Sequence, residues 1–130
     1  MRLGLLLFSA IFLMGGWQQL TEPEPRAQMA VDAGLPRPPT ALVRGSGVAM
    51  IMSAFGIQFP RTRGISAAVL AVQLPIVTFI GQRFWDLPPG PERRLTAILF
   101  TKNMSLLGGA LIILDRAMSK RTGFRSDREE

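Results

Sequence analysis

The chain has 130 residues, of which 48% are hydrophobic and 18% are charged, and its formal net charge is +6. It contains no cysteine and no histidine, which excludes disulfides, thiol redox chemistry, Cys or His metal sites and haem ligation by either residue. The basic residues are scattered through connections and a C-terminal tail instead of gathering on one face, so the positive charge does not indicate nucleic-acid binding.

Four apolar stretches of 18 to 20 residues take up most of the chain, at 3–20, 41–59, 64–82 and 95–114. At about 1.5 Å per residue, each predicts a helix of roughly 27 to 30 Å, close to the thickness of a bilayer's hydrocarbon core. The segment 65–80 has no charged residue, whereas a core helix of a water-soluble bundle would need a polar face. The sequence therefore predicts an all-α membrane protein in which residues 1–115 form one bundle of four transmembrane helices.

The first stretch has two interpretations. Arg2 followed by the apolar segment 3–14 is typical of a secretory signal peptide, but residues 15–19 offer a poor cleavage site, so a retained helix is favoured. Four spans place both termini on one side of the membrane. Eight basic residues fall on that side and six on the other, so the positive-inside rule predicts cytoplasmic termini.

The connections between the spans are unequal. The first, 21–40, contains five prolines and leaves room only for a short helical turn near 26–33, and the third, 83–94, is also rich in proline. Trp17 and Trp85 are expected at the interface on this elaborated side, where indole rings anchor in the headgroup zone. The polar segment 116–130 is predicted to be a mobile cytoplasmic tail without an apolar stripe.

Gln73 and Pro75 fall near the middle of the third predicted span, and Thr78 lies one turn beyond them. A proline at this position frees the carbonyl of Ala71 and kinks the helix. One hypothesis is that Gln73 and Thr78 line a polar pocket for a ligand. The alternative is that both bond to neighbouring helices or to their own backbone, at about 0.6 kcal/mol each.

Lys102 and Asn103 lie about two turns inside the fourth predicted span, where charge is expensive. Lys102 would be about 10 Å deep, so its side chain could extend back to the headgroups. In the alternative, Lys102 and Asn103 face the bundle interior and bind a carboxylate, a lipid phosphate or a quinone oxygen. No carboxylate lies within any predicted span, so an acidic partner for Lys102 would have to come from a loop or from another protein.

Small residues recur at helical spacing in two of the predicted spans. They are Gly45, Ala49 and Ser53 in the second and Thr101, Ser105, Gly108 and Gly109 in the fourth. Because lipid gives no hydrophobic drive for helix association, close backbone approach at small residues takes over that role. These residues are predicted to pack helices within the bundle, with dimerisation as the alternative.

The segment 100–111, with Phe100, Lys102, Asn103 and the glycine pair, resembles the signature of the bacterial DoxX family. The similarity continues in residues 2–4, in Gly15 and Gly16 before an aromatic residue, in 34–36, 44–55 and 61–64, and in the pair Phe84 and Trp85. This resemblance implies a small four-helix protein of the bacterial plasma membrane with a role in redox physiology. Some relatives are described as the membrane subunit of a thiosulfate:quinone oxidoreductase.

The chain departs from the DoxX pattern at two places. Family members often carry a glutamate in the second span, where this chain has residues 48–51 without one, and a histidine before the Phe-Trp pair, where Gln82 and Arg83 stand. We therefore do not expect an autonomous enzyme, because few side chains remain that could transfer protons within the bilayer.

Two hypotheses for function follow. In the first, the protein is an accessory or anchoring subunit of a membrane redox or respiratory assembly, with a membrane protein or a second copy as partner. In the second, Lys102, Asn103, Gln73 and Thr78 hold a quinone while a partner carries the redox centre. A transporter is the weaker third hypothesis, because no inverted repeat or charged relay is evident. No metal and no covalently bound cofactor is expected, and a quinone is the candidate ligand.

Overall fold

The computed structural model describes residues 2–34 and 40–126, and all the regular elements in these ranges are helices. They are α1 (Arg2–Thr21), α2 (Glu24–Asp32), α3 (Thr40–Gly56), α4 (Arg63–Gly81), the short 3-10 helix η1 (Phe84–Asp86) and α5 (Pro91–Ser126). The all-α prediction is confirmed. The prolines at 36, 38 and 39, the 35–36 part of the DoxX resemblance and residues 127–130 of the predicted tail lie outside the described residues.

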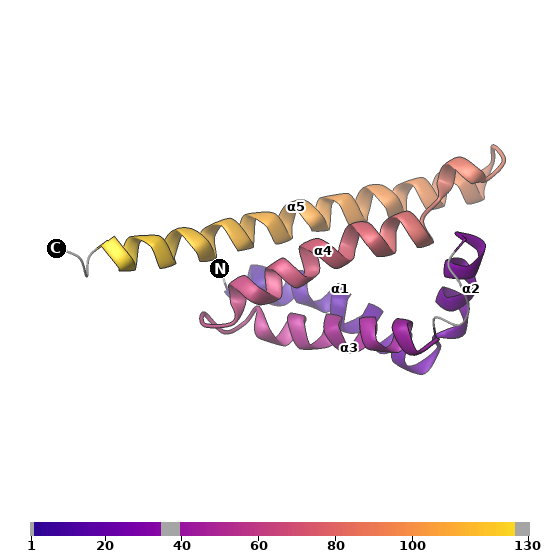
Figure 1. Cartoon of the computed structure of the whole chain (residues 1–130). Coiled ribbons are helices and arrows are strands. Elements are labelled where there is room, and N and C mark those ends of the chain that lie inside the picture. Colours follow the sequence, from indigo (N-terminus) through magenta and orange to yellow (C-terminus); the bar gives the residue numbers. More distant parts are fainter. Residues whose placement is uncertain (1, 35–39, 127–130) are drawn as a thin grey trace.

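The four long helices follow one another in antiparallel order, and the start of α1 and the end of α5 lie toward the same end of the bundle (Figure 1). α1 packs along α3, and α4 packs along α5, so the bundle consists of two helix pairs that are joined mainly through α3 and α4. α2 and η1 lie at the other end, where the two pairs diverge (Figure 1). A core of buried side chains between the pairs includes Leu5 and Phe12 of α1, Leu70 and Leu74 of α4 and Ala110 of α5.

α1 and α4 begin and end within one residue of the stretches predicted from the sequence, but α3 and α5 differ. α3 ends at Gly56, three residues before the predicted end at 59. α5 begins at Pro91 instead of Leu95, because proline fits the first turn of a helix, where its missing N–H is not needed. The predicted tail also continues α5 as a helix as far as Ser126.

Polar groups in the tight turn between α3 and α4 explain why α3 stops early. Thr62 Oγ1 donates a hydrogen bond to the carbonyl of Gly56 at 2.7 Å. Arg63 Nε donates to the carbonyl of Ile57 at 2.9 Å, and Arg63 Nη2 donates to that of Gln58 at 3.3 Å. These donors satisfy carbonyls that the end of a helix leaves without partners. The Ile57 side chain is fully buried, so the turn is also held by the core.

The backbones of α1 and α3 approach each other closely where the helices cross at Gly16 and Gly47. A Cβ atom added at Gly47 would lie 2.7 Å from the carbonyl oxygen of Gly16 and 2.9 Å from Cβ of Gln19. A Cβ added at Gly16 would likewise lie 2.7 Å from the carbonyl oxygen of Gly47. Only glycine fits at both positions, so these two residues set the distance between α1 and α3.

The predicted packing residues of α3 are therefore partly wrong. Gly45 is exposed, and a Cβ added there would meet nothing within 4 Å, whereas Ala49 is half-buried and Ser53 is buried. The contact face of α3 runs through Gly47, Met50, Ser53 and Ala54. Because almost every face of α3 is apolar or small, the sequence pattern does not mark which face meets α1.

Of the four residues of α5 that were predicted to pack helices, Gly109 alone closely approaches another described helix. A Cβ added at Gly109 would lie 2.9 Å from the ring of Phe8, so Gly109 lets α1 approach α5. Gly108 has open space around it. Thr101 and Ser105 are exposed, and their hydroxyls donate to carbonyls one turn back, Ala97 and Thr101, at 3.0 and 3.1 Å. These three residues do not pack against another described helix.

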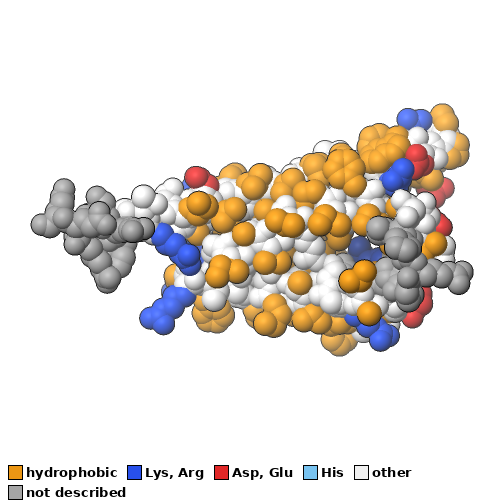
Figure 2. Space-filling view, in the orientation of Figure 1, with side chains coloured by type: hydrophobic (Ala, Val, Ile, Leu, Met, Phe, Trp, Pro, Cys, Tyr) orange, Lys and Arg blue, Asp and Glu red, His pale blue; other side chains and the backbone are white. Residues whose placement is uncertain are grey.

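The surface between the two ends of the bundle is largely apolar, and in the view of Figure 2 the charged side chains gather toward the ends. Leu7 of α1 is 68% exposed, Leu42 of α3 76%, Val72 of α4 66% and Ile98 of α5 64%. Three segments, Arg2–Thr21, Arg63–Asp86 and Pro91–Gly123, are long and apolar enough to cross a membrane, while Thr40–Gly56 is a shorter apolar helix.

Aromatic rings bind η1 to the neighbouring ends of α4 and α5. The rings of Phe79, Phe84, Trp85 and Phe100 lie with centroids 5.2 to 6.1 Å apart, in tilted or edge-to-face pairs. Such pairs contribute about 0.5 to 1.5 kcal/mol beyond their buried area. Trp85 is 41% exposed and Trp17, near the end of α1, is 64% exposed, so both indoles reach the surface toward the end that carries α2 and η1.

Replacing Gly47 with alanine is expected to lower the free energy of unfolding by about 1 to 3 kcal/mol, because the added methyl group meets a backbone carbonyl that cannot move away. Gly45→Ala, two residues earlier in the same helix, provides the control and should leave stability unchanged or slightly raised. Thermal unfolding of the purified variants measures both. Equal effects of the two substitutions would contradict this account of the α1–α3 crossing.

Arg63→Gln is expected to destabilise the protein by about 1 to 3 kcal/mol, because two carbonyls at the end of α3 lose a charged donor. Arg61→Gln removes an exposed arginine from the same turn and should have little effect, since within 2–34 and 40–126 Arg61 takes part in a hydrogen bond through its backbone carbonyl alone, which accepts from Arg121 Nη2. Chemical denaturation of both variants tests this difference.

Candidate functional site

A polar cavity lies between α1, α2, α4 and α5, with one lining residue from α3, Met50, near the end of the bundle that carries α2. Its volume is about 140 Å³. The residues that line it are Ile11, Phe12, Met14, Gly15, Gln18, Arg26, Met50, Leu74, Val77, Gln82, Lys102, Asn103 and Leu106. The lining thus combines two cationic side chains and three amides with apolar side chains, and it contains no carboxylate.

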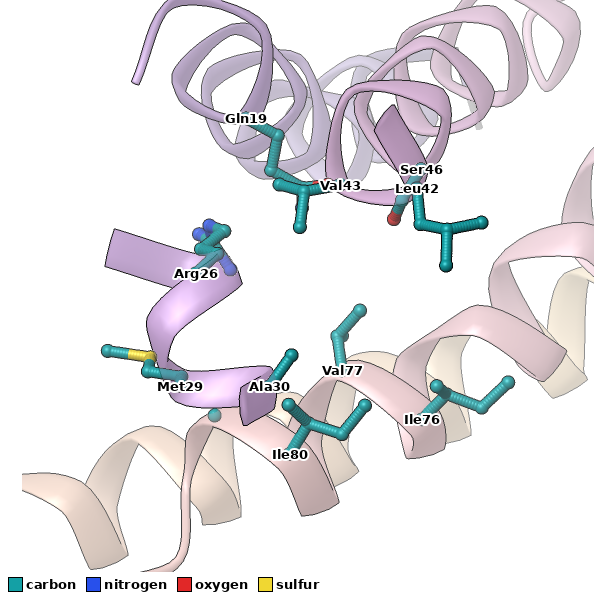
Figure 3. Close-up of a pocket in the computed structure, with 11 residues that line it drawn as sticks. Gln19, Arg26, Met29, Ala30, Leu42, Val43, Ser46, Ile76, Val77 and Ile80 are labelled. Carbon is teal, nitrogen blue, oxygen red and sulfur yellow. The ribbon is translucent and has the colours of Figure 1, made fainter. Parts of the chain in front are cut away.

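An apolar pocket of about 210 Å³ adjoins the polar cavity, and Figure 3 shows its lining. Leu42 and Val43 of α3 and Ile76, Val77 and Ile80 of α4 reach into it from opposite sides, and Arg26 lies at its border (Figure 3). Gln19, Met29, Ala30, Ser46 and Gly81 complete the lining. Arg26 and Val77 line both spaces, so these two residues mark the passage between them.

A groove on the surface continues from the apolar pocket between α3 and α4. The groove and the pocket share Leu42, Ser46, Ile76 and Val77. The other residues of the groove are Ala41, Gly45, Ala49, Ala68, Val69, Val72 and Gln73. The polar cavity, the apolar pocket and the α3–α4 groove therefore form a series of adjoining spaces that leads from charged groups to the outer apolar surface.

Helix α2 holds Arg26 in this position. Pro23 precedes the helix and is fully buried, and Ala27 and Ala30 pack inward at 9% and 5% exposure. Gly34, at a φ of +95°, ends the helix in a left-handed conformation that favours glycine, and its N–H donates to the carbonyl of Val31. Pro23, Ala27 and Ala30 thus hold α2 against the bundle, and its half-buried Arg26 lies on the side that faces the bundle.

Burial lowers the pKa of the Arg26 guanidinium from its usual value, because desolvation penalises the charged form. Arginine still remains protonated near neutral pH. The structure shows one ion pair among the described residues, between Arg83 Nε and Asp86 Oδ2 at 2.6 Å. Within the same residues, neither Arg26 nor Lys102 has a carboxylate partner. The polar cavity therefore carries positive charge that these ranges of the chain do not neutralise.

The four residues that the sequence predicted to bind one ligand do not line the same space in the structure. Lys102, which is exposed, and Asn103, which is half-buried, both line the polar cavity. Gln73 lines the α3–α4 groove instead, where its Nε2 donates to the carbonyl of Ser46 at 2.8 Å and also contacts Ser46 Oγ. Thr78 is fully buried and lines none of these three spaces.

Two buried oxygens have no hydrogen-bond partner among the described residues, Gln73 Oε1 and Thr78 Oγ1. Gln73 therefore serves as an interhelical donor to α3, which is the structural alternative considered for it, while its carbonyl oxygen stays unpaired beside the groove. The free-energy cost of burying the unpaired oxygen offsets part of the stabilisation from the hydrogen bond that Gln73 Nε2 donates.

Sequence reasoning missed Arg26, Gln18 and Gln82 as members of the cavity. Arg26 stands in a proline-rich connection, and the sequence pointed to a short helical turn there, which α2 confirms, but not to its docking against the bundle. Gln82 directly follows α4, and Gln18 lies in the last turn of α1. Gln18 and Gln82 both fall at helix ends on the side of the bundle that carries α2, and this shared position could have marked them as neighbours. Across 2–34 and 40–126, no group of three or more acidic residues could hold a metal ion.

Substituting Gln73 tests its role between α3 and α4. Gln73→Leu removes the bond to Ser46 together with the unpaired oxygen, so unfolding should become easier by less than about 1 kcal/mol. Gln73→Glu keeps the shape but places a carboxylate against the carbonyl of Ser46 and should cost clearly more, about 1 to 3 kcal/mol. Denaturation of the purified variants at neutral pH compares them, and a larger loss in Gln73→Leu would contradict this role.

Comparison with known proteins gives one match. A family model described as a domain of unknown function, DUF8561, matches residues 8–82, which run from α1 to the end of α4. No curated protein and no solved structure matches the chain. The matched segment contains Gln18, Arg26 and Gln82 of the polar cavity, whereas Lys102 and Asn103 are supplied by α5, outside it.

Proposed function

The chain belongs to the DUF8561 family, a domain of unknown function, and we propose that it is a multi-pass membrane protein that serves as an accessory or anchoring subunit of a membrane assembly. The carrying observation is the sparse burial of α5. In the apolar part of α5, only 11% is buried within the protein, against 28% in α1 and 33% in the Arg63–Asp86 segment. An apolar helix with so few internal contacts has a large face left for lipid or for another protein.

The apolar surface between the two ends of the bundle, and the charged side chains toward those ends, support membrane insertion. Exposed aliphatic side chains occur on all four long helices, and a water-soluble protein would not leave so much contiguous apolar surface uncovered. The 17 residues of α3 span about 25 Å, slightly less than a bilayer core, which slight thinning of the bilayer accommodates. The 36 residues of α5 span about 54 Å, so its charged end from Asp115 onward extends beyond the membrane on the side of the termini.

The outer face of α5 supports the accessory role. Thr101, Ser105 and Gly108 are exposed there, and such small and hydroxyl-bearing residues let a second helix approach closely in lipid. A membrane-protein partner or a second copy of this chain would cover this face. The redox or respiratory setting of the assembly rests on the resemblance to the DoxX family, as does the bacterial plasma membrane as its location.

A quinone-binding subunit is the second candidate, and the polar cavity is the observation that favours it. Lys102 and Asn103 line this cavity, but Gln73 and Thr78 do not, so a quinone would have to be held by the first two together with Arg26, Gln18 or Gln82. Lys102→Met should then remove quinone that co-purifies with the protein. Retention of the quinone by this variant would exclude the site.

Topology is measured with single cysteines, since the chain contains none of its own. Asp32→Cys and Lys120→Cys place exposed thiols near opposite ends of the bundle. With the termini in the cytoplasm, a membrane-impermeant maleimide should label Asp32→Cys in intact cells and Lys120→Cys only after permeabilisation. The opposite pattern would invert the topology, and recovery of the protein in the soluble fraction would refute membrane insertion.

The accessory role predicts a partner that depends on the α5 face. Ser105→Trp should strongly reduce co-purification of the partner in mild detergent, because the indole separates the two helices. Leu7→Trp, at an exposed position of α1, should leave the complex intact. Mass spectrometry of the purified samples at native expression levels makes the comparison. A stable partner that is equally retained by both variants would place the interface elsewhere.

A further inference from the structure

The charge of the polar cavity is the starting point. Arg26 and Lys102 line it from α2 and α5, and no acidic residue is among its lining residues. The amides of Gln18, Gln82 and Asn103 add hydrogen-bond donors at the same place. Two cations in one small cavity repel each other, and an anion between them would turn this repulsion into attraction. Neutral carbonyl ligands such as quinones would leave both charges uncompensated.

The spaces beside this cavity have the opposite character. The apolar pocket begins at Arg26 and Val77, and it leads into the α3–α4 groove on the outer surface. Figure 3 shows Arg26 facing a space that is otherwise lined mainly by aliphatic side chains. A ligand that fills the whole series must carry negative charge at one end and a flexible hydrocarbon chain at the other.

We propose that the polar cavity binds the headgroup of an anionic membrane lipid, whose acyl chain lies in the apolar pocket and leaves through the α3–α4 groove. This rests on the proposed insertion of the protein in a membrane, since the groove then faces the lipid from which the ligand enters. Arg26 and Lys102 bind the phosphate, and the amides orient it through further hydrogen bonds. The lipid also fills the gap where the two helix pairs diverge, so it stabilises the docking of α2.

The first experiment measures lipid binding to the purified, delipidated full chain in detergent. Phosphatidylglycerol, phosphatidylcholine and inorganic phosphate are added separately, and binding is followed by native mass spectrometry and by the shift in thermal unfolding. Phosphatidylglycerol should bind and stabilise the protein, and phosphatidylcholine should do so far less. Equal effects of the two lipids would overturn the proposal. A shift of the same size with inorganic phosphate would assign the cavity to a soluble anion and would overturn the lipid assignment.

Variants of the two cations test the headgroup site. Arg26→Gln and Lys102→Met should each weaken phosphatidylglycerol binding about tenfold or more, because each removes a charge-assisted contact. Arg44→Gln is the matched control, as Arg44 is exposed in the second turn of α3 and lines none of the three spaces. Unchanged binding in both cavity variants, or an equal loss in Arg44→Gln, would refute the site.

A second pair of variants tests the path of the acyl chain. Gly45→Phe should weaken lipid binding by filling the groove, and the open space around Gly45 means that the fold should tolerate the ring. Gly108→Phe is the control, because Gly108 has equally open space on α5, away from the groove. Equal binding by both would refute the path. Cysteine labelling decides membrane insertion separately, so a correctly inserted protein without lipid dependence would fail this inference alone.

Discussion

The division of the bundle into two close-packed helix pairs is the constraint on which its other features depend. α1 and α3 approach through Gly16 and Gly47, where even one methyl group would strike a backbone carbonyl. Once these axes are fixed, α3 meets α4 through the short turn that Arg63 and Thr62 hold. The pairs lie together near this turn and diverge toward the other end (Figure 1). The polar cavity and the apolar pocket lie there, and α2 docks beside them.

The hydrogen bonds between helices in the described part of the chain are few and local. Near the end with the termini, Ser9 Oγ donates to the carbonyl of Ala54 at 3.1 Å, and Gln58 Nε2 donates to Ser9 Oγ at 2.8 Å. In the middle, Gln73 links α4 to α3 at Ser46. Such bonds give modest energy in a lipid environment but favour one rotation of each helix over others. They therefore fix which helix faces meet, which uniform apolar surfaces leave undetermined.

The sequence predicted the four long helices because apolar length is a strong signal, and α1 and α4 are correct within one residue. It could not predict rotation about the helix axes. In α3, glycine, alanine and serine occur on more than one face, so Gly45 was chosen although Gly47 makes the contact. The positions of Lys102 and Gln73 along their helices followed from counting residues. The sides of the helices on which they lie did not, and the two side chains line different spaces.

The sequence did not predict that Arg26 lines the cavity, and here the cause is the shortness of α2. A short helix between proline-rich segments has too few residues to show an amphipathic pattern, so its docking follows from tertiary contacts of Ala27 and Ala30. Those contacts place Arg26 in the lining of the cavity that Lys102 also lines, although like charges favour separation. The burial of Pro23, Ala27 and Ala30 favours docking of α2, whereas that repulsion and the desolvation of Arg26 oppose it. An anion in the cavity would reverse the sign of the electrostatic contribution, and α2 and its ligand would then stabilise each other.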